Sequence, residues 1–431
     1  MPSKYFPLLL VLCISSFSAF SQRFLSDYDS TLFLKDTMPD VVRRLENLHF
    51  SGYIQPQFQV AQRAGAEGFA GGNFQPYSKS RFMLRRARVK IDYLMQLKGH
   101  QNPLGLFTFQ IDATERGVNV RDMFLKVYEP NKGDLSMTMG LFARPFGFEV
   151  NYSSSYRETP ERGRMSQILM PTERDLGAMV SWDPRQQSPG SADFKLDAGV
   201  FNGQGLAATA EFDTYKDFIA RATLKRLSLS RDLTLSGGLS FLNGGWRQQT
   251  SYRYETVKGS TPVYVLDSSL ENIGTRVAKE YYGADMQLSL QHGWGETEIR
   301  GEYWTGKQPG TAVSTMNPGS LPSGPSYLRH FDGAFFYFLQ SLVNSKWQLL
   351  LKYDWYDPNT HAAGKELNAA AGFTSADVKY STLGTGLVHY ANQHLKFIVY
   401  YDQVKNEITA LPDYTTDRKD NILTFRIQML F

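Results

Sequence analysis

Apolar and polar residues alternate along most of this chain. The last segment, NILTFRIQMLF at residues 421–431, shows the pattern clearly, with Ile422 and Leu430 as exceptions. The apolar positions share one parity, and they are Leu423, Phe425, Ile427, Met429 and Phe431. The polar positions share the other, and they are Thr424, Arg426 and Gln428. Because side chains of a β-strand point to opposite faces in turn, this period predicts a strand with one apolar and one polar face.

Sixteen runs of this kind, each ended by turn residues, are predicted as strands. They cover residues 48–60, 81–97, 104–113, 119–129, 135–142, 175–183, 193–201, 216–228, 232–243, 279–291, 295–305, 326–342, 346–357, 377–391, 393–405 and 420–431. The run at 81–97 separates its faces well. Its apolar face holds Ala87, Val89, Ile91, Tyr93, Met95 and Leu97. Its polar face holds Arg86, Arg88, Lys90, Asp92 and Gln96.

The connections between these runs alternate in length. The short ones are KGHQNP, PNKGD, SLS, HGW, VNS and N, and the turn at 184–192 is moderately long. The long ones are 61–80, 143–174, 202–215, 244–278, 306–325, 358–376 and 406–419, with 114–118 as a short exception. A β-sandwich has no reason to sort its loops in this way, and no propeller-type repeat of about 40–45 residues is evident. Outer-membrane barrels do sort them.

The predicted fold class is therefore all-β: a 16-stranded antiparallel transmembrane β-barrel with short periplasmic turns and long external loops. In lipid every backbone polar group must be paired, so such a sheet has to close on itself. Sixteen strands enclose an interior too wide for wall side chains to fill, which favours an aqueous channel.

The N-terminal residues predict export. Lys4, the apolar run FPLLLVLCISSFSAF and the small residues Ala19 and Ser21 are typical of a signal peptide, here 1–21. Residues 22–47 are predicted to be a periplasmic segment with a short helix in MPDVVRRLEN, and 48–431 the barrel. The only cysteine, Cys13, lies inside the predicted signal peptide, and an exported chain without disulfides is ordinary for a bacterial envelope.

Composition narrows the class further. The formal charge is +4 for 431 residues, a near balance that gives no case for nucleic-acid binding. After the N-terminal run no second apolar stretch of 18 residues occurs, which argues against helical membrane spans.

Four segments resemble the phosphate-selective porin O and P family of Gram-negative bacteria. They are RFMLRRARVKIDY, FTFQIDATERGVNVRDMFLKVYEP, MTMGLFARPFGFEVNYSSSYRETPERG and ERDLGAMVSWDP, and the match covers roughly residues 48–183. The most specific element is GLFARPFGFE followed by RE-PER. The resemblance implies a trimeric outer-membrane channel of sixteen strands, with a loop folded inward and a lumen lined by basic residues.

Candidate selectivity residues lie on the polar strand faces and in the connection 143–174, which is the candidate inward-folded constriction loop. Arginine suits an anion channel because its planar fork is always charged and binds oxyanions in a bidentate way. The candidates for pore lining and anion binding are Arg86, Arg88, Lys90, Lys126, Arg144, Arg157, Arg162, Arg164, Arg221, Lys225 and Arg426. The loop also carries Glu149, Glu158, Glu161 and Glu173. The competing interpretation is that lumenal charges pair across strands only to remain satisfied.

The sequence predicts no enzyme, no catalytic residue, no metal site and no cofactor. It contains no G-x-S-x-G elbow, no H-E-x-x-H pair and no cysteine outside the predicted signal peptide. The first function hypothesis is a passive porin of a Gram-negative outer membrane, for small hydrophilic solutes with a weak anion preference that extends to phosphate. The alternatives are a barrel whose external loops, above all 143–174 and 244–278, bind a surface ligand or partner, and a loop-borne hydrolase. Expected partners are outer-membrane lipid, small anionic or polar solutes, two further copies in a homotrimer, and the barrel-assembly machinery, which would read Phe431.

Overall fold

The computed structural model describes residues 47–96, 102–184, 193–208, 210–259, 262–342 and 345–431. The predicted signal peptide and all but the last residue of the predicted periplasmic segment lie outside these ranges, so both stay predictions. Within the described ranges, no helix has the length and apolar character needed to cross a bilayer.

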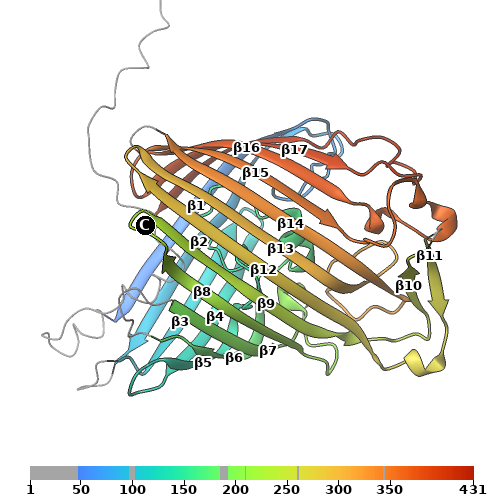
Figure 1. Cartoon of the computed structure of the whole chain (residues 1–431), viewed down its shortest axis with the longest axis horizontal. Helices are drawn as coiled ribbons and strands as arrows, with labels where there is room; N and C mark the ends of the chain where they lie inside the picture. Colours follow the sequence, from blue (N-terminus) through green and yellow to red (C-terminus); the bar gives the residue numbers. More distant parts are fainter. Residues whose placement is uncertain (1–46, 97–101, 185–192, 209, 260–261, 343–344) are drawn as a thin grey trace, which may run out of the picture.

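Sixteen strands form the wall of a closed barrel. They are β1 (Leu48–Ala61), β2 (Ser80–Met95), β3 (Gly105–Thr114), β4 (Gly117–Tyr128), β5 (Leu135–Ala143), β6 (Arg174–Trp182), β7 (Asp193–Phe201), β8 (Asp217–Ser228), β9 (Leu233–Arg247), β12 (Arg276–His292), β13 (Gly295–Gly310), β14 (Ser326–Leu342), β15 (Trp347–Asp357), β16 (Tyr380–Tyr390), β17 (Leu395–Asn406) and β18 (Ile422–Leu430). Each pairs antiparallel with the next, β9 passes to β12, and β18 returns to β1 (Figure 1). The predicted fold class is confirmed.

The connection 244–278 differs from its prediction as one long loop. β9 and β12 extend into it as far as Arg247 and Arg276, and between them β10 (Arg253–Val257) and β11 (Val263–Asp267) form a hairpin outside the wall. β10 pairs in parallel with the start of β14. RYETV and VYVLD carry the β-branched and aromatic residues typical of strands. At five residues each they are too short to span a bilayer, so they do not show the longer alternation that predicts a wall strand.

β13 also runs five residues past its predicted end. Gly306 and Pro309 look like turn residues, yet they pair with Phe331 and Leu328 on β14. β14 is 17 residues long and offers backbone pairing partners over this stretch. Pairing with β14 outweighs the local preference of Gly306 and Pro309 for a turn.

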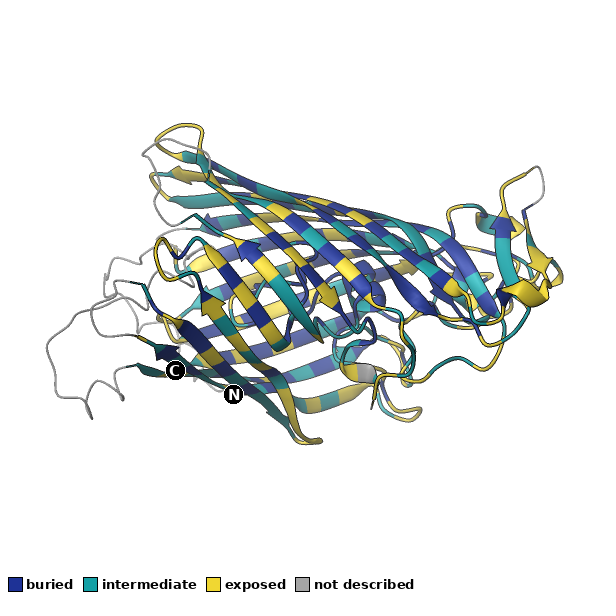
Figure 2. Ribbon diagram, turned by 90° about the horizontal axis from the view of Figure 1, so that it is seen from below, coloured by how far each residue is buried: buried dark blue, intermediate teal, exposed yellow. Residues whose placement is uncertain are grey.

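The two faces of the wall divide as the alternation predicts. On β18, Phe425 and Ile427 are 41% and 47% exposed on the outside, whereas Arg426 is 3% exposed on the inside. Figure 2 shows the same alternation of exposed and buried positions along the strands around the wall. A continuous apolar outer face of this kind is unfavourable in water and is satisfied by lipid.

The seam between β18 and β1 gives a direct test. Phe431 exchanges two backbone hydrogen bonds with Gly52, each 2.9 Å long, and its ring lies against Gly52. Deleting Phe431 removes both bonds, a loss of about 1–3 kcal/mol, and leaves polar groups of β1 unpaired near lipid. The fraction of heat-modifiable, folded protein in the outer-membrane fraction is expected to fall. Phe431→Tyr keeps ring and backbone and is the control; equal assembly of the deletion and the control would contradict this role.

Candidate functional site

The connection between β5 and β6, residues 144–173, lies inside the barrel and is here called the crossing loop. It contains one short helix, α2 (Arg164–Leu169). Although it leaves the wall at β5, it bonds to strands far around the barrel. These include β1, β2, β13, β14, β15, β17 and β18. The loop therefore spans the interior from one side of the wall to the other.

The loop enters the interior at Glu302 of β13. The Glu302 carboxylate accepts the backbone N–H groups of Phe148 and Glu149, both at 2.9 Å, and the indole N–H of Trp304 at 2.6 Å. Gly147 has φ +67°, and a Cβ there would lie 2.1 Å from Glu302 Oε1. Only glycine tolerates both that backbone conformation and that approach. The RPFG segment thus turns the chain inward onto a fixed carboxylate.

Glu149 organises the next turn. Its carboxylate accepts the N–H of Gly163 at 2.8 and 2.9 Å, the Ser166 hydroxyl at 2.5 Å and the Tyr337 hydroxyl at 2.9 Å. Burial by itself would raise the pKa of Glu149, but Lys352 and nearby loop groups outweigh it and lower the pKa. Glu149 thereby ties the start of α2 to β14.

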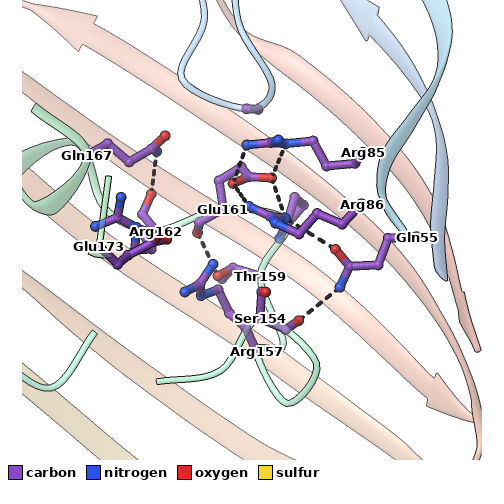
Figure 3. Close-up of polar contacts among 12 residues, drawn as sticks. Gln55, Arg85, Arg86, Ser154, Arg157, Thr159, Glu161, Arg162, Gln167 and Glu173 are labelled. Carbon is purple, nitrogen blue, oxygen red and sulfur yellow. Dashed lines mark hydrogen bonds and ion pairs between the residues drawn. The ribbon is translucent and has the colours of Figure 1, made fainter. Parts of the chain in front are cut away.

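Glu161 of the crossing loop pairs with three arginines of the wall. Arg85 donates to it at 2.8 and 3.1 Å and Arg86 at 3.0 and 2.6 Å (Figure 3). Arg426 donates to it at 3.1 Å. Arg426 also donates to the Pro160 carbonyl oxygen at 2.7 Å. Burial alone would raise the pKa of Glu161, but Arg85, Arg86 and Arg426 outweigh it and hold the pKa well below its usual range. One carboxylate among three arginines leaves a local excess of positive charge.

Arg85 was missed by the sequence analysis because a β-bulge breaks the alternation at its position. The register between β1 and β2 shifts from Gln55 opposite Arg86 to Pro56 opposite Leu84, so Arg85 has no partner across the ladder. A bulge re-aims one side chain, and both Arg85 and Arg86 consequently reach Glu161. Pro56, which lacks a backbone N–H, was the available signal.

Further contacts hold the rest of the loop. Arg300 of β13 binds Glu158 in a bidentate way at 2.9 and 3.0 Å and is itself held by Glu298. Lys396 of β17, which was not among the candidates, donates to the carbonyl oxygens of Ser155 at 3.1 Å and Arg157 at 2.9 Å. Lys396 could not be assigned from sequence because its partners are backbone atoms of a distant loop.

The end of the loop is fixed by a second arginine cluster. Glu173 is contacted by Arg121 of β4, by Arg162 at 3.3 Å and by Arg174 at 3.5 Å. Arg174 also pairs with Asp122 at 3.0 Å. Burial would raise the pKa of Glu173, but the three arginines lower it well below its usual range.

The candidate arginines within the crossing loop act mainly on the loop itself. Arg144 donates to the Thr172 carbonyl oxygen, and Arg157 to that of Tyr152 at 3.1 Å. Arg162 donates to the carbonyl oxygens of Ser166 and Met170 at 2.9 and 3.0 Å. All three are buried. Arg164 instead stacks against aromatic rings.

The remaining candidates are distributed along the inner wall. Arg88 pairs with Asp112 at 2.9 Å, and Lys90 with Asp92 at 2.7 Å. Lys126 lies over the ring of Tyr128. Arg221 pairs with Asp285 at 2.6 Å. Lys225 contacts Asp183 and, at 3.4 Å, Asp193. Of the eleven candidates, the structure brings Arg86 and Arg426 together on one carboxylate and spreads these five around the wall.

The inner wall itself is asymmetric. On β14 to β17 an apolar cluster of Leu339, Leu350, Val388 and Ile398 lies beside buried charged groups such as Lys352 and Lys396. Met165 and Leu169 of α2, with Met170 just after it, belong to a second cluster that includes the wall aromatics Trp304 and Phe331. On β2 to β8 the inner face is polar, and the exposure of its charged side chains ranges from 6% for Arg88 to 30% for Lys195. The solvated part of the interior is therefore displaced toward β2–β8.

Within the described part of the chain, no group of three or more His, Cys, Asp or Glu side chains is arranged to hold a metal ion. The chemistry of the interior is that of charge pairing and hydrogen bonding.

Comparisons with known proteins agree with the architecture. The outer membrane channel DcaP of Acinetobacter baumannii is 10% identical, over 89% of this chain and 97% of that one, with a TM-score of 0.53. Salmonella typhi OmpF, determined in complex with daunomycin, is 11% identical over the same shares, with a TM-score of 0.51. At these identities the likeness is one of fold. No family matches the sequence, and a comparison with curated proteins also gives no match.

The closed sixteen-stranded wall and its apolar outer face define a transmembrane β-barrel of the Gram-negative outer membrane, with the fold of porins. The narrower resemblance to the phosphate-selective O and P family stays a prediction.

Replacing Glu161 tests whether its ion pairs with the three wall arginines hold the crossing loop in place. Glu161→Gln leaves Arg85, Arg86 and Arg426 without their shared counter-charge, and breaking a buried ion pair of this kind costs about 3–5 kcal/mol. Trypsin should then cut the crossing loop at least tenfold faster in the purified, folded protein. Glu271→Gln, on an exposed external loop, is the matched control. If trypsin cut the loop equally slowly in Glu161→Gln and in the control, the ion pairs of Glu161 would not be what holds the crossing loop in place.

The lowered pKa of Glu161 also predicts a pH dependence. A carboxylate with a depressed folded-state pKa contributes stability above its unfolded pKa of about 4.3, and this is lost as pH falls through the folded value. Hydrogen exchange in the crossing loop, corrected for intrinsic rates, should be constant from about pH 8 to 5 and rise only in stronger acid. A rise centred near neutral pH would contradict the assignment.

Proposed function

We propose that this protein is a porin, a passive channel for small hydrophilic solutes with a weak anion preference. The observation that carries the proposal is a loop spanning the interior beside a polar wall whose charged side chains keep solvent exposure. A loop in this position narrows the passage without filling it. The charged wall suits water and polar solutes rather than an apolar ligand.

The anion preference rests on the cluster at Glu161. Arg85, Arg86 and Arg426 share one carboxylate, so positive charge is in excess where the loop meets β2 and β18. The preference is weak because other wall cations, such as Arg88 and Arg221, are neutralised by acids within 3 Å. Inorganic phosphate is the natural oxyanion to test, since arginine forks bind oxyanions in a bidentate way.

Planar-bilayer recording of the purified protein under a potassium chloride gradient tests the proposal. Stepwise conductance with a reversal potential displaced toward chloride is expected, and millimolar phosphate should reduce the chloride current if the cluster binds oxyanions. Absence of steps would refute the channel, and a reversal potential displaced toward potassium would refute the anion preference.

Assembly as a homotrimer is part of this proposal and is tested by the mass of the detergent-solubilised protein. A monomeric mass with unchanged conductance would contradict the trimer but not the channel.

The alternative, an external binding surface, is favoured by one observation. Arg329 pairs with Asp377 at 2.8 Å, and Asp377 also accepts the Tyr264 hydroxyl at 2.5 Å, so the β10–β11 hairpin is fixed against the neighbouring external loop. An ordered external platform suits a surface contact. Deleting the hairpin would favour this function if it abolished cell-surface binding and left conductance intact.

Arg85 offers a selective test of the anion preference. Its side chain is 28% exposed, and Arg86 and Arg426 still neutralise Glu161 in its absence. One unit charge at 4 Å in water is worth about 1 kcal/mol, so Arg85→Gln should lower the chloride-to-potassium permeability ratio by roughly two- to fivefold. Arg116→Gln, at an exposed external turn, is the control. An identical ratio in Arg85→Gln and wild type would place the selectivity elsewhere.

A further inference from the structure

A cleft opens between the crossing loop and the wall of β15 to β18, toward the end of the barrel that bears the long loops. The first external loop, near Phe69, closes it on one side and Asp420 on another, and Lys352, Asp354, Tyr400 and Asp402 form its wall. Its volume, about 40 Å³, is larger than the 10–15 Å³ that one water molecule needs.

The cleft contains a guanidinium that lies near the carboxylates of Asp354 and Asp420 but forms no direct ion pair with them within the described residues. Arg164 lies between two aromatic rings, with its guanidinium carbon 4.4 Å from the centroid of Phe69 and 3.8 Å from that of Tyr380. No hydrogen bond or ion pair of this guanidinium is formed within the described residues, and its Nε is buried without a partner. Ring stacking fixes the plane of the fork and leaves its donor edge available.

The same cleft contains acidic groups without partners. Asp420 is 4% exposed, and its Oδ1 has no hydrogen-bond partner within the described part of the chain. The Asp402 carboxylate forms no hydrogen bond or ion pair with the residues that the structure describes, although its backbone pairs within the wall. The hydroxyl of Tyr400, 2% exposed, is likewise unpartnered there. Asp354, by contrast, is paired with Lys352 at 3.2 Å.

These groups specify the chemistry of an occupant. A simple anion would pair with Arg164 but lie near the carboxylates of Asp402 and Asp420. A simple cation would pair with those carboxylates but lie near Arg164. A molecule with one carboxylate and one ammonium satisfies both sides, because a carboxylate matches the arginine fork and an ammonium donates to carboxylate and hydroxyl oxygens. Buried polar groups in folded proteins are nearly always hydrogen-bonded, so several unpartnered ones around a single cleft indicate a missing partner.

We propose that this cleft binds a small zwitterion of amino-acid size, with its carboxylate on Arg164 and its ammonium between Asp402 and Asp420. The site deepens the proposed porin function, because it adds a binding site for amino-acid-like solutes on the external side of the crossing loop. Binding in the cleft does not require a conducting pore. Only the onward passage of the bound solute rests on the proposed porin function.

Ligand-observed saturation-transfer NMR on the folded protein in detergent micelles tests the site. The probes are ω-amino acids from glycine to 6-aminohexanoate, compared with butyrate and butylammonium. One member of the series should bind at least tenfold more tightly than either singly charged probe. Equal binding of zwitterion, anion and cation, or water alone in the cleft with no saturation transfer, would overturn the proposal.

Substitutions within the cleft identify the groups responsible. Arg164→Gln, Asp402→Asn and Asp420→Asn should each weaken binding of that zwitterion at least tenfold. Lys419→Gln and Asp413→Asn remove the same charges from exposed positions of the loop that carries Asp420 and should change binding less than twofold. Asp413 has φ +68°, a conformation that asparagine also accepts. Equal affinity in cleft variants and controls would overturn the site.

Heat-modifiable gel mobility confirms folding of every variant, and Arg164→Lys provides a milder substitution that keeps the charge and loses the fork. Bilayer recording of the same preparations separates the two proposals. Anion-preferring pores without zwitterion binding would overturn this site alone, whereas zwitterion binding without conductance would overturn the porin function alone.

Discussion

The requirement that dominates this structure is the pairing of every backbone N–H and C=O within hydrocarbon. An unpaired group there costs several kcal/mol, so the sheet has to close, and it closes where β18 meets β1. The outer face must then be apolar, which produces the strict two-residue alternation of the wall. The number of strands sets the diameter of the closed barrel. With sixteen strands the interior is wider than the side chains of the wall can fill.

The crossing loop is the response to that wide interior. The backbone and the charged side chains of the loop are largely buried inside the barrel. Each buried charge therefore needs a counter-charge or hydrogen bonds beside it. Glu302, Glu149, Glu161 and Glu173 supply this at four successive points, and each joins the loop to a different part of the wall. Apolar residues of α2 cover the remaining surface against wall aromatics. The resulting interior is packed on the side of β14–β17 and keeps solvent-exposed charged side chains on the side of β2–β8.

The sequence predicted the wall far better than the contents of the barrel. Alternation is a local property of each strand, so the boundaries of β7 and β14 were predicted to the residue. Arg85 was missed because a bulge is decided by the pairing of two strands, and Lys396 because its partners are carbonyl oxygens of a loop more than 200 positions away. The β10–β11 hairpin was missed because short external strands do not have the length of a membrane span. Arg86 and Arg426 were identified as inward-facing from parity alone, but parity contains no information that both meet Glu161.

The central claim is that the crossing loop, and not the wall, sets the width of the passage. Single-channel conductance in the presence of poly(ethylene glycol) of graded size measures that width directly. It should be compared between the wild type and a variant in which residues 148–171 are replaced by a short glycine-serine linker, with folding checked by heat-modifiable mobility. The account predicts a larger conductance and admission of larger polymers in the shortened variant. The same conductance and the same polymer cut-off in both proteins would contradict it.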